Sequence, residues 1–309
     1  MTFDPRSCRL CPRQCAADRT ASAGFCRAPD GAVVSRAMLH RFEEPTVSGT
    51  DPKRGAGTVF FEGCTMRCVY CQNKAISREV RGEVLDAAGL AKIFAELRDA
   101  GAYNIDLVSP TPYAPYIAGA LDILGDSLAV PVVWNTGGYE TVGTVREMAG
   151  YVGVWLADVK YASDDLSREY SSAPGYPDTA FAALHAMVEA AGRPEYYDDG
   201  GAHLMRRGVI VRHLCLPGHR RDTEAVLRRL RDEFAPDEIV LSLMSQYTPG
   251  FAPEKYRNLS RPITTFEYDF AANLAEELGF DGFTQEKTSA KRAFTPDFAG
   301  DGEDGGAFK

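Results

Sequence analysis

The stretch TVFFEGCTMRCVYC (58–71) places three cysteines directly after a short apolar run. Cys64, Cys68 and Cys71 stand at C-x3-C-x2-C spacing, so one tight loop presents all three. A four-iron cluster takes four cysteine thiolates, and three leave one iron open to another ligand, as catalytic zinc sites keep one position open. The alternatives are part of a zinc ligand set or a chance cluster. The preceding apolar run reads as a buried strand, and this context favours the iron–sulfur interpretation.

Composition narrows the function classes. The 309 residues carry a net charge of −9, which argues against a nucleic-acid partner held by phosphate attraction. No apolar run approaches membrane-spanning length, and the N-terminus lacks the apolar region of a signal peptide, so we expect a cytoplasmic protein without membrane contact. In a reducing compartment, eight cysteines at these spacings indicate metal rather than disulfides. An exported disulfide protein is the competing view, and the missing signal argues against it.

Three zones are predicted along the chain. Residues 1–57 form an N-terminal four-cysteine metal-binding segment with little regular periodicity. Residues 58–283 alternate short apolar runs with amphipathic stretches. Residues 284–309 form a C-terminal extension whose last part, TPDFAGDGEDGGAFK (295–309), is rich in Gly and Asp and is expected to be disordered.

Six short apolar runs are predicted to be strands of a buried parallel sheet. They are Thr58–Phe61, Ile105–Val108, Val130–Trp134, Val152–Leu156, Val209–Val211 and Ile239–Leu243. Helical patterns lie between them, with Asp222 predicted to cap one helix and Thr264 with Glu267 predicted to form a capping box on another. Strand–helix alternation of this kind builds parallel sheets. Six units are too few for a closed eight-stranded barrel, so the predicted fold is α/β, an open (β/α)6 TIM-like partial barrel with an N-terminal cysteine-rich extension.

Polar residues follow every predicted strand, where barrel folds collect their working groups. The candidates are Tyr70, Ser109, Thr111, Asn135, Thr136, Asp158, Lys160, Arg212 and Tyr247. Each alone has an ordinary explanation, such as a turn at 135–138 or a structural ion pair between Asp158 and Lys160. Together they predict one cavity for a zwitterionic cofactor that carries adenosine. YYDDGGAH (196–203) reads as a hairpin tip that would cover the mouth of this cavity.

The motifs resemble the radical S-adenosylmethionine (SAM) superfamily, and residues 40–285 are most similar to uncharacterised iron–sulfur homologues of pyruvate formate-lyase activating enzyme. The stretches that carry the resemblance are CPRQC (11–15), SGTDPKRGAGTVFFEGCTMRCVYCQN (48–73), SPTPY (109–113), NTGGYE (135–140), DVKY (158–161), VRHLCLPG (211–218) and SLMSQYTP (242–249).

This resemblance implies the cofactors and the fold of that superfamily. Cys64, Cys68 and Cys71 would ligate a [4Fe-4S] cluster whose open iron chelates SAM, and an electron from the cluster would cleave SAM to a 5′-deoxyadenosyl radical. Asn135 and Thr136 match the SAM-site turn of the activating enzymes. Asp158, Lys160 and Arg212 match positions near SAM and near the glycine loop of the partner.

The chain departs from the family pattern at two places. Ser109-Pro110-Thr111 stands where these enzymes usually carry Gly-Gly-Glu for the SAM amino group. Asn135 and Gly137 replace the Asp and Asn of the activase turn. SAM anchoring is therefore expected to differ in detail. The chain also has no ferredoxin-like insertion between the cluster motif and the barrel, which many activases of glycyl radical enzymes carry.

The N-terminal cysteines are a second metal candidate. Cys8, Cys11, Cys15 and Cys26 offer four thiolates, enough for a closed structural zinc or for a fully ligated second iron–sulfur cluster. Both metals accept four sulfurs, and the sequence leaves the two alternatives open. A cluster would relay electrons, whereas zinc would pin a small loop-rich segment.

The leading functional hypothesis is hydrogen abstraction in the activation of a glycyl radical enzyme, with a flavodoxin- or ferredoxin-type protein as reductant. The alternative is radical modification of a small molecule or a peptide by the same chemistry. A third reading is a non-catalytic iron–sulfur or zinc electron carrier or interaction protein. The incomplete cysteine set argues against a carrier, which would normally have its cluster fully ligated.

Overall fold

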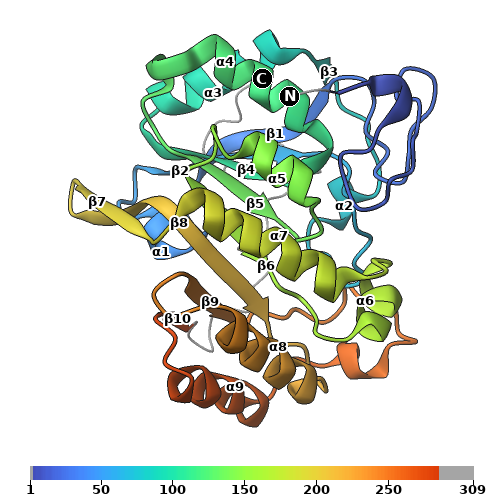
Figure 1. Cartoon of the computed structure of the whole chain (residues 1–309), viewed down its shortest axis with the longest axis vertical. Coiled ribbons are helices and arrows are strands. Elements are labelled where there is room, and N and C mark those ends of the chain that lie inside the picture. Colours follow the sequence, from blue (N-terminus) through green and yellow to red (C-terminus); the bar gives the residue numbers. More distant parts are fainter. Residues whose placement is uncertain (1–2, 285–309) are drawn as a thin grey trace.

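Seven parallel strands form the centre of this computed structural model, which describes residues 3–284 (Figure 1). The sheet order is β10-β9-β8-β6-β5-β4-β2-β1-β3, with β7 paired to β8. The strands are β1 (Ala32–His40), β2 (Gly55–Phe61), β3 (Val84–Leu85), β4 (Ala102–Val108), β5 (Val132–Thr136), β6 (Val154–Asp158), β7 (Glu195–Asp199), β8 (Ala202–Leu214), β9 (Val240–Met244) and β10 (Gly282–Thr284). Within this part of the chain β2 and β10 do not pair, so the barrel is open and partial.

The helices are α1 (Pro45–Ser48), α2 (Lys74–Ser77), α3 (Ala87–Asp99), α4 (Ala114–Leu124), α5 (Val142–Met148), α6 (Asp164–Ser171), α7 (Tyr176–Ala191), α8 (Arg220–Glu233) and α9 (Thr265–Glu277). Of these, α3, α4, α5, α7, α8 and α9 pack on the outer face of the sheet, whereas α1 lies inside the barrel. The predicted fold class and all six predicted strands are confirmed, and β10 adds a further parallel strand. The predicted extension at 284–309 lies outside the described residues except for Thr284.

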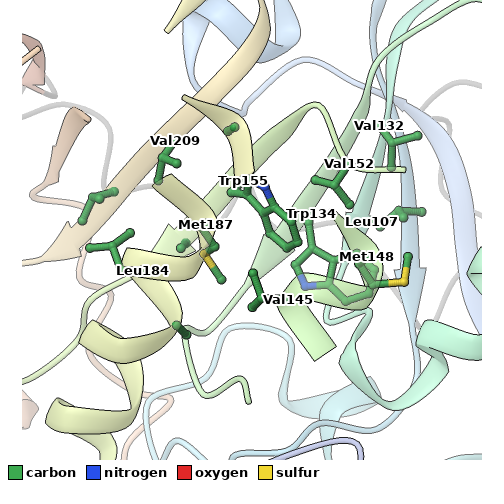
Figure 2. Packing of buried hydrophobic residues seen from close by; sticks show 14 of the residues in the cluster. Leu107, Val132, Trp134, Val145, Met148, Val152, Trp155, Leu184, Met187 and Val209 are labelled. Atoms are coloured by element: carbon green, nitrogen blue, oxygen red, sulfur yellow. The ribbon is translucent and has the colours of Figure 1, made fainter. Parts of the chain in front are cut away.

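Alternation along the strands separates two apolar layers. Trp134 and Trp155 point outward, with ring centroids 6.1 Å apart, and pack against α5 and α7 (Figure 2). Val154 and Leu156, the neighbours of Trp155 in sequence, point into the barrel. The inner layer also contains Val47 of α1, whose carbonyl accepts a hydrogen bond from Asn104 Nδ2 at 2.7 Å. Helix α1 thus fills the amino-terminal half of the barrel and leaves space at the carboxyl ends.

The edges of the sheet hold two additions that the strand predictions did not include. Strand β1, from the segment 1–57, pairs antiparallel with β2, and β3 pairs with β1. The second half of that segment is therefore part of the sheet, while the boundary at residue 57 stays a prediction.

The predicted hairpin tip at 196–203 is a hairpin, but its predicted place over the cavity is wrong. Gly200 and Gly201 turn between β7 and β8 with positive φ values of 60° and 89°. The turn precedes β8 and so lies at the amino-terminal side of the sheet, where Tyr197 Oη donates to the Tyr103 carbonyl at 3.1 Å. The hairpin projects from the left edge in Figure 1, away from the N-terminal segment on the right.

One of the two predicted helix caps is confirmed. Thr264 and Glu267 form the capping box of α9. Asp222 does not cap α8, which begins at Arg220 after His219. Its carboxylate instead accepts hydrogen bonds from the backbone N–H of Ala162 and of Ser163, at 3.2 and 2.9 Å. Asp222 therefore ties α8 to the loop that follows β6.

Candidate active site

The three cysteines of residues 64–71 follow β2 and line one cavity of about 250 Å³ at the carboxyl ends of the strands. Burial raises the pKa of the Cys64 thiol to about 12. Because metal ligation requires thiolates, uptake of a metal group here must release protons. Ser171 Oγ donates to Cys68 Sγ at 3.0 Å, and the backbone N–H of Met66 donates to Cys64 Sγ at 3.4 Å. Both contacts favour negative charge on the sulfurs.

Hydrogen bonds between backbone groups hold this cysteine loop against the end of α6. The N–H groups of Arg67 and Val69 donate to the carbonyls of Ser171 and Tyr170, at 3.0 and 2.7 Å. The loop begins at Gly63, whose φ is 79° and where a Cβ atom would lie 2.4 Å from the Cys26 carbonyl oxygen. A glycine is therefore required at this position, where the backbone of the loop lies against that of Cys26.

The turns that follow β4 and β5 bring main-chain groups close to the cavity. Ser109 has a φ of 60°, uncommon for a residue with a side chain, and its N–H donates to the Asn135 carbonyl at 2.9 Å. Gly137 lines the cavity, and a Cβ there would lie 3.0 Å from Met66 Sδ. At Gly138, a Cβ would lie 2.2 Å from the Asp158 carbonyl oxygen, so the turn after β5 depends on that glycine.

A buried charge network forms the floor of the cavity. Arg212 donates to Asp158 at 2.8 Å, to Glu43 at 3.2 Å and also to Asn135, while Lys160 pairs with Asp158. Burial opposes ionisation of Asp158, but Arg212 and Lys160 together hold its pKa below the ordinary value. Burial raises the pKa of Glu43. These ion pairs offset the cost of burying charge beside the cavity.

Most of the predicted site residues meet in this cavity. Those that line it are Cys64, Cys68, Tyr70, Cys71, Ser109, Asn135, Thr136, Asp158, Lys160, Arg212 and Tyr247. Thr111 does not line the cavity, because its buried hydroxyl donates to Glu140. Glu140 Oε1 also accepts hydrogen bonds from Thr136 Oγ1 at 2.6 Å and Trp134 Nε1 at 3.2 Å, so it supports the turn after β5 from behind.

Sequence reasoning did not foresee that the end of β1 would line the cavity, through His40, Phe42 and Glu43. They lie inside the segment that was interpreted only as a metal-binding extension. The apolar stretch AVVSRAMLH (32–40) was the available signal for a strand. Nothing local indicated that the antiparallel partner of β2 would deliver Glu43 to Arg212.

The four N-terminal cysteines lie outside the cavity. Cys8 and Cys11 are buried, Cys26 is partly buried and Cys15 is exposed. Between them, Arg13 Nε donates to the Thr65 carbonyl of the cysteine loop at 3.0 Å, and its guanidinium stacks on Phe25 at 3.7 Å. Among the described residues, no three His, Cys, Asp or Glu side chains converge closely enough for one metal ion.

The residues present fit an iron–sulfur cluster with SAM. Three soft thiolates suit iron, and a cluster that carries each thiolate on a separate iron does not need them to converge on one point. Beside them, hydroxyl, amide and ionic groups face the same space, as a cofactor with amino, carboxylate and ribose groups requires. The glycine turn after β5 allows a ligand to approach the backbone.

Comparisons with known proteins agree with this fit. The family model described as the radical SAM superfamily matches residues 58–230. An uncharacterised protein of Methanocaldococcus jannaschii is 28% identical over 287 residues, which cover 89% of this chain and 76% of that protein.

Two solved structures give weaker likenesses. A radical SAM methyltransferase from Sphaerobacter thermophilus shares 16% identity with a TM-score of 0.51, over 76% of this chain and 67% of that chain, which shows the fold alone. A domain of a pyruvate-formate lyase-activating enzyme from Bacteroides vulgatus reaches a TM-score of 0.40 at 12% identity, over 56% of this chain and 93% of that chain. The likeness to this domain is too weak to support a conclusion about function.

No helix in residues 3–284 is long and apolar enough to cross a membrane.

Proposed function

The chain belongs to the radical SAM superfamily, and we propose that it activates a glycyl radical enzyme by removing a hydrogen atom from a glycine of that partner. The cofactors of this family are a [4Fe-4S] cluster and SAM. The motif likeness at 135–140, 158–161 and 211–218 supports the activase assignment. The exposed aromatic residue beside the cavity, Phe42, is the observation that carries it.

The cavity that the three cysteines line opens at the carboxyl ends of the strands, next to Phe42. Glycine is the smallest residue that a protein loop could bring into a space shared with SAM. Phe42, which lines the cavity, leaves 53% of its surface exposed. An exposed aromatic residue at this place suits contact with a protein partner.

In this proposal, Cys64, Cys68 and Cys71 hold the cluster. When bound, the cluster and SAM supply a carbon-centred adenosyl radical, which is chemistry of the cofactors rather than of a side chain. Ser109, Asn135 and Thr136 would hold the polar groups of SAM, while Tyr70 and Tyr247 would exclude water from the cluster side.

The charged floor has a separate role in binding. Asp158, Lys160 and Arg212 are already paired with one another or with Glu43, and they would orient polar groups without a change in net charge. The same floor also favours the alternative function, since a zwitterionic small molecule or a peptide terminus would find both charge signs there.

The N-terminal cysteines are proposed to hold a second metal centre, either zinc or a fully ligated cluster. Arg13 joins this segment to the cysteine loop, and a single zinc would require the thiols to draw together on binding, because no three of them converge on one point among the described residues. Iron, sulfide and zinc content per chain, compared between the wild type and Cys11→Ser, tells the two metals apart.

The reductant is proposed to dock beside the cysteine loop. Arg27, Arg67 and Arg81 line a concave surface there together with Glu79, on a chain whose net charge is −9. A local excess of arginines suits the acidic surface of a flavodoxin or ferredoxin. If so, electron delivery by such a protein weakens with added salt, whereas reduction by dithionite does not weaken in parallel.

The activation itself is tested anaerobically. The reconstituted protein is incubated with SAM, dithionite and purified pyruvate formate-lyase, and 5′-deoxyadenosine and the electron paramagnetic resonance (EPR) signal of a glycyl radical are measured. We expect both, and no radical on a lyase whose radical-bearing glycine is replaced by alanine. Production of 5′-deoxyadenosine with no radical on the lyase would instead favour modification of a small molecule or peptide.

A further inference from the structure

A chain of buried hydroxyl groups ends on one cysteine of the loop. Tyr70 Oη lies 2.6 Å from Tyr161 Oη, which lies 2.7 Å from Ser171 Oγ, which lies 3.0 Å from Cys68 Sγ. Tyr161 and Ser171 are fully buried, and Tyr70 is 7% exposed. The chain joins the loop after β6 and the end of α6 to the cysteine loop, and it is not part of the cavity floor.

The direction of these hydrogen bonds follows from counting protons. Each hydroxyl has one proton to donate. A ligating Cys68 is a thiolate without a proton, so Ser171 must donate to it. Ser171 has then no proton for Tyr161, so Tyr161 donates to Ser171. By the same reasoning Tyr70 donates to Tyr161, and all three hydroxyl dipoles point toward the Cys68 sulfur.

Packing alone does not account for this arrangement. The tyrosines belong to an aromatic layer with Met66, Tyr139 and Tyr176 around the loop, and phenylalanine would fill the same space. A buried hydroxyl without a partner is costly, so the sequence uses three hydroxyls only where each satisfies the next. Ser77 Oγ lies 3.6 Å from Cys71 Sγ, farther than Ser171 lies from Cys68, and no further hydroxyl is hydrogen-bonded to Ser77 among the bonds described. Cys68 is therefore the thiolate that receives a cooperative chain.

We propose that Ser171, supported by Tyr161 and Tyr70, tunes the reduction potential of the cluster by donating a hydrogen bond to the Cys68 thiolate. This inference rests on the proposed role of Cys68 as a cluster ligand. Reduction adds negative charge that spreads onto the sulfurs, and a donor at a sulfur stabilises that charge. The chain makes the cluster easier to reduce. Ser171 acts through Cys68 and is a positioning residue.

The test is the midpoint potential of the reconstituted cluster, measured by redox titration followed by EPR. Ser171→Ala is expected to lower the one-electron reduction equilibrium constant about tenfold, a shift of about 59 mV to more negative potential. Tyr161→Phe should lower it less, and Tyr70→Phe least. Ser171→Thr, which keeps a hydroxyl, should restore the wild-type potential.

Ser167→Ala is the matched control. Ser167 is fully buried one turn earlier in α6, but its hydroxyl bonds to the Asp164 and Ala173 carbonyls rather than to sulfur. Its potential should match the wild type. An unchanged potential in Ser171→Ala overturns the proposal.

Two other results would need a further measurement. If Ser171→Ala takes up no cluster, the midpoint potential of Tyr161→Phe, which leaves Ser171 in place, becomes the test. An unchanged potential in that variant overturns the proposal. Absence of a cluster in the wild type would contradict the proposed function itself, and iron content distinguishes this from a failed tuning role.

Discussion

Two sets of cysteines lie next to each other in this protein and face different surroundings. Cys64, Cys68 and Cys71 line a polar cavity at the carboxyl ends of the strands. The N-terminal set lies behind the loop, with two buried thiols and an exposed one at Cys15. The chemistry of the thiol is the same in both. If both sets hold metal as proposed, a centre at the loop would face open space where a substrate could react, whereas a centre at the N-terminal set would be enclosed.

The two sets are also in contact. Arg13, between Cys11 and Cys15, donates to the Thr65 carbonyl, and Arg67 of the loop donates to the Phe25 carbonyl at 3.0 Å. The Cys26 carbonyl lies against Gly63. The N-terminal set therefore affects the cysteine loop either through these contacts alone or also through a metal centre of its own, and variants can separate the two.

The largest effect is expected from the loop itself. Cys68→Ala leaves at most two ligands for the cluster, so SAM cleavage should fall to the background of a reaction without protein. The measurement is 5′-deoxyadenosine production together with iron content. Cys215→Ala, which removes a buried cysteine outside both sets, should retain cleavage. Full cleavage by the Cys68 variant would contradict the ligand assignment.

The second largest effect is expected at the N-terminal cysteines and tests whether the two sets bind metal independently. Cys11→Ser should lose the N-terminal metal and lower the thermal midpoint, because structural metal binding contributes directly to folding free energy. The cluster signal of the loop should persist. Metal analysis and thermal unfolding measure this outcome, and loss of both metal centres in this variant would show that the sets do not assemble separately.

A smaller effect is expected at the contact between the sets. Arg13→Ala removes charge-assisted hydrogen bonds to the Thr65 and Ser172 carbonyls, each worth about 1.5–3 kcal/mol when well formed. We expect a several-fold slower SAM cleavage at unchanged N-terminal metal content. Arg9→Ala, at an exposed arginine of the same segment, is the control. Equal rates for the two variants would mean that the loop does not depend on this contact.

The smallest effect is expected at Glu267 of α9, which lies away from both sets of cysteines, so its substitution should change only the stability of the fold. The hydrogen bond and charge of Arg261, together with backbone N–H donors, hold the pKa of Glu267 below its ordinary value. Its stabilising contribution is therefore present above the unfolded pKa of about 4.3 and is lost as the pH falls from there through the lower folded pKa. Glu267→Gln keeps the capping box but removes the charge that pairs with Arg261, so it should cost up to about 1 kcal/mol at pH 7, with a smaller difference at pH 3. Urea unfolding at both pH values measures it. Metal content should not change, and a difference that grows at low pH would contradict the assigned sign.

Local patterns were enough to predict the parallel core and most of the cavity. The strands that carry Asn135, Asp158 and Arg212 are short apolar runs, and parallel strands bring their carboxyl ends together whatever their exact register. Thr111 could not be placed in the same way. Whether its hydroxyl faces the cavity or Glu140 depends on the 3-10 turn at 111–113, which backbone propensities do not specify.

Other misses have the same origin. Asp222 has the residue type of a helix cap, but the loop after β6 competes for its carboxylate. The hairpin at 196–203 was identified correctly, yet its side of the barrel depends on the direction in which β8 enters the sheet.

Three cysteines at fixed short spacing are a local property, and the strand and helix periods that follow are local as well, so both could be predicted from the order of residues. Which distant residues act together depends on the fold, since Glu43 reaches Arg212 across 169 residues and Ser171 reaches Cys68 across 103. Such pairs depend on strand order and on side-chain direction, and no single stretch of chain encodes either.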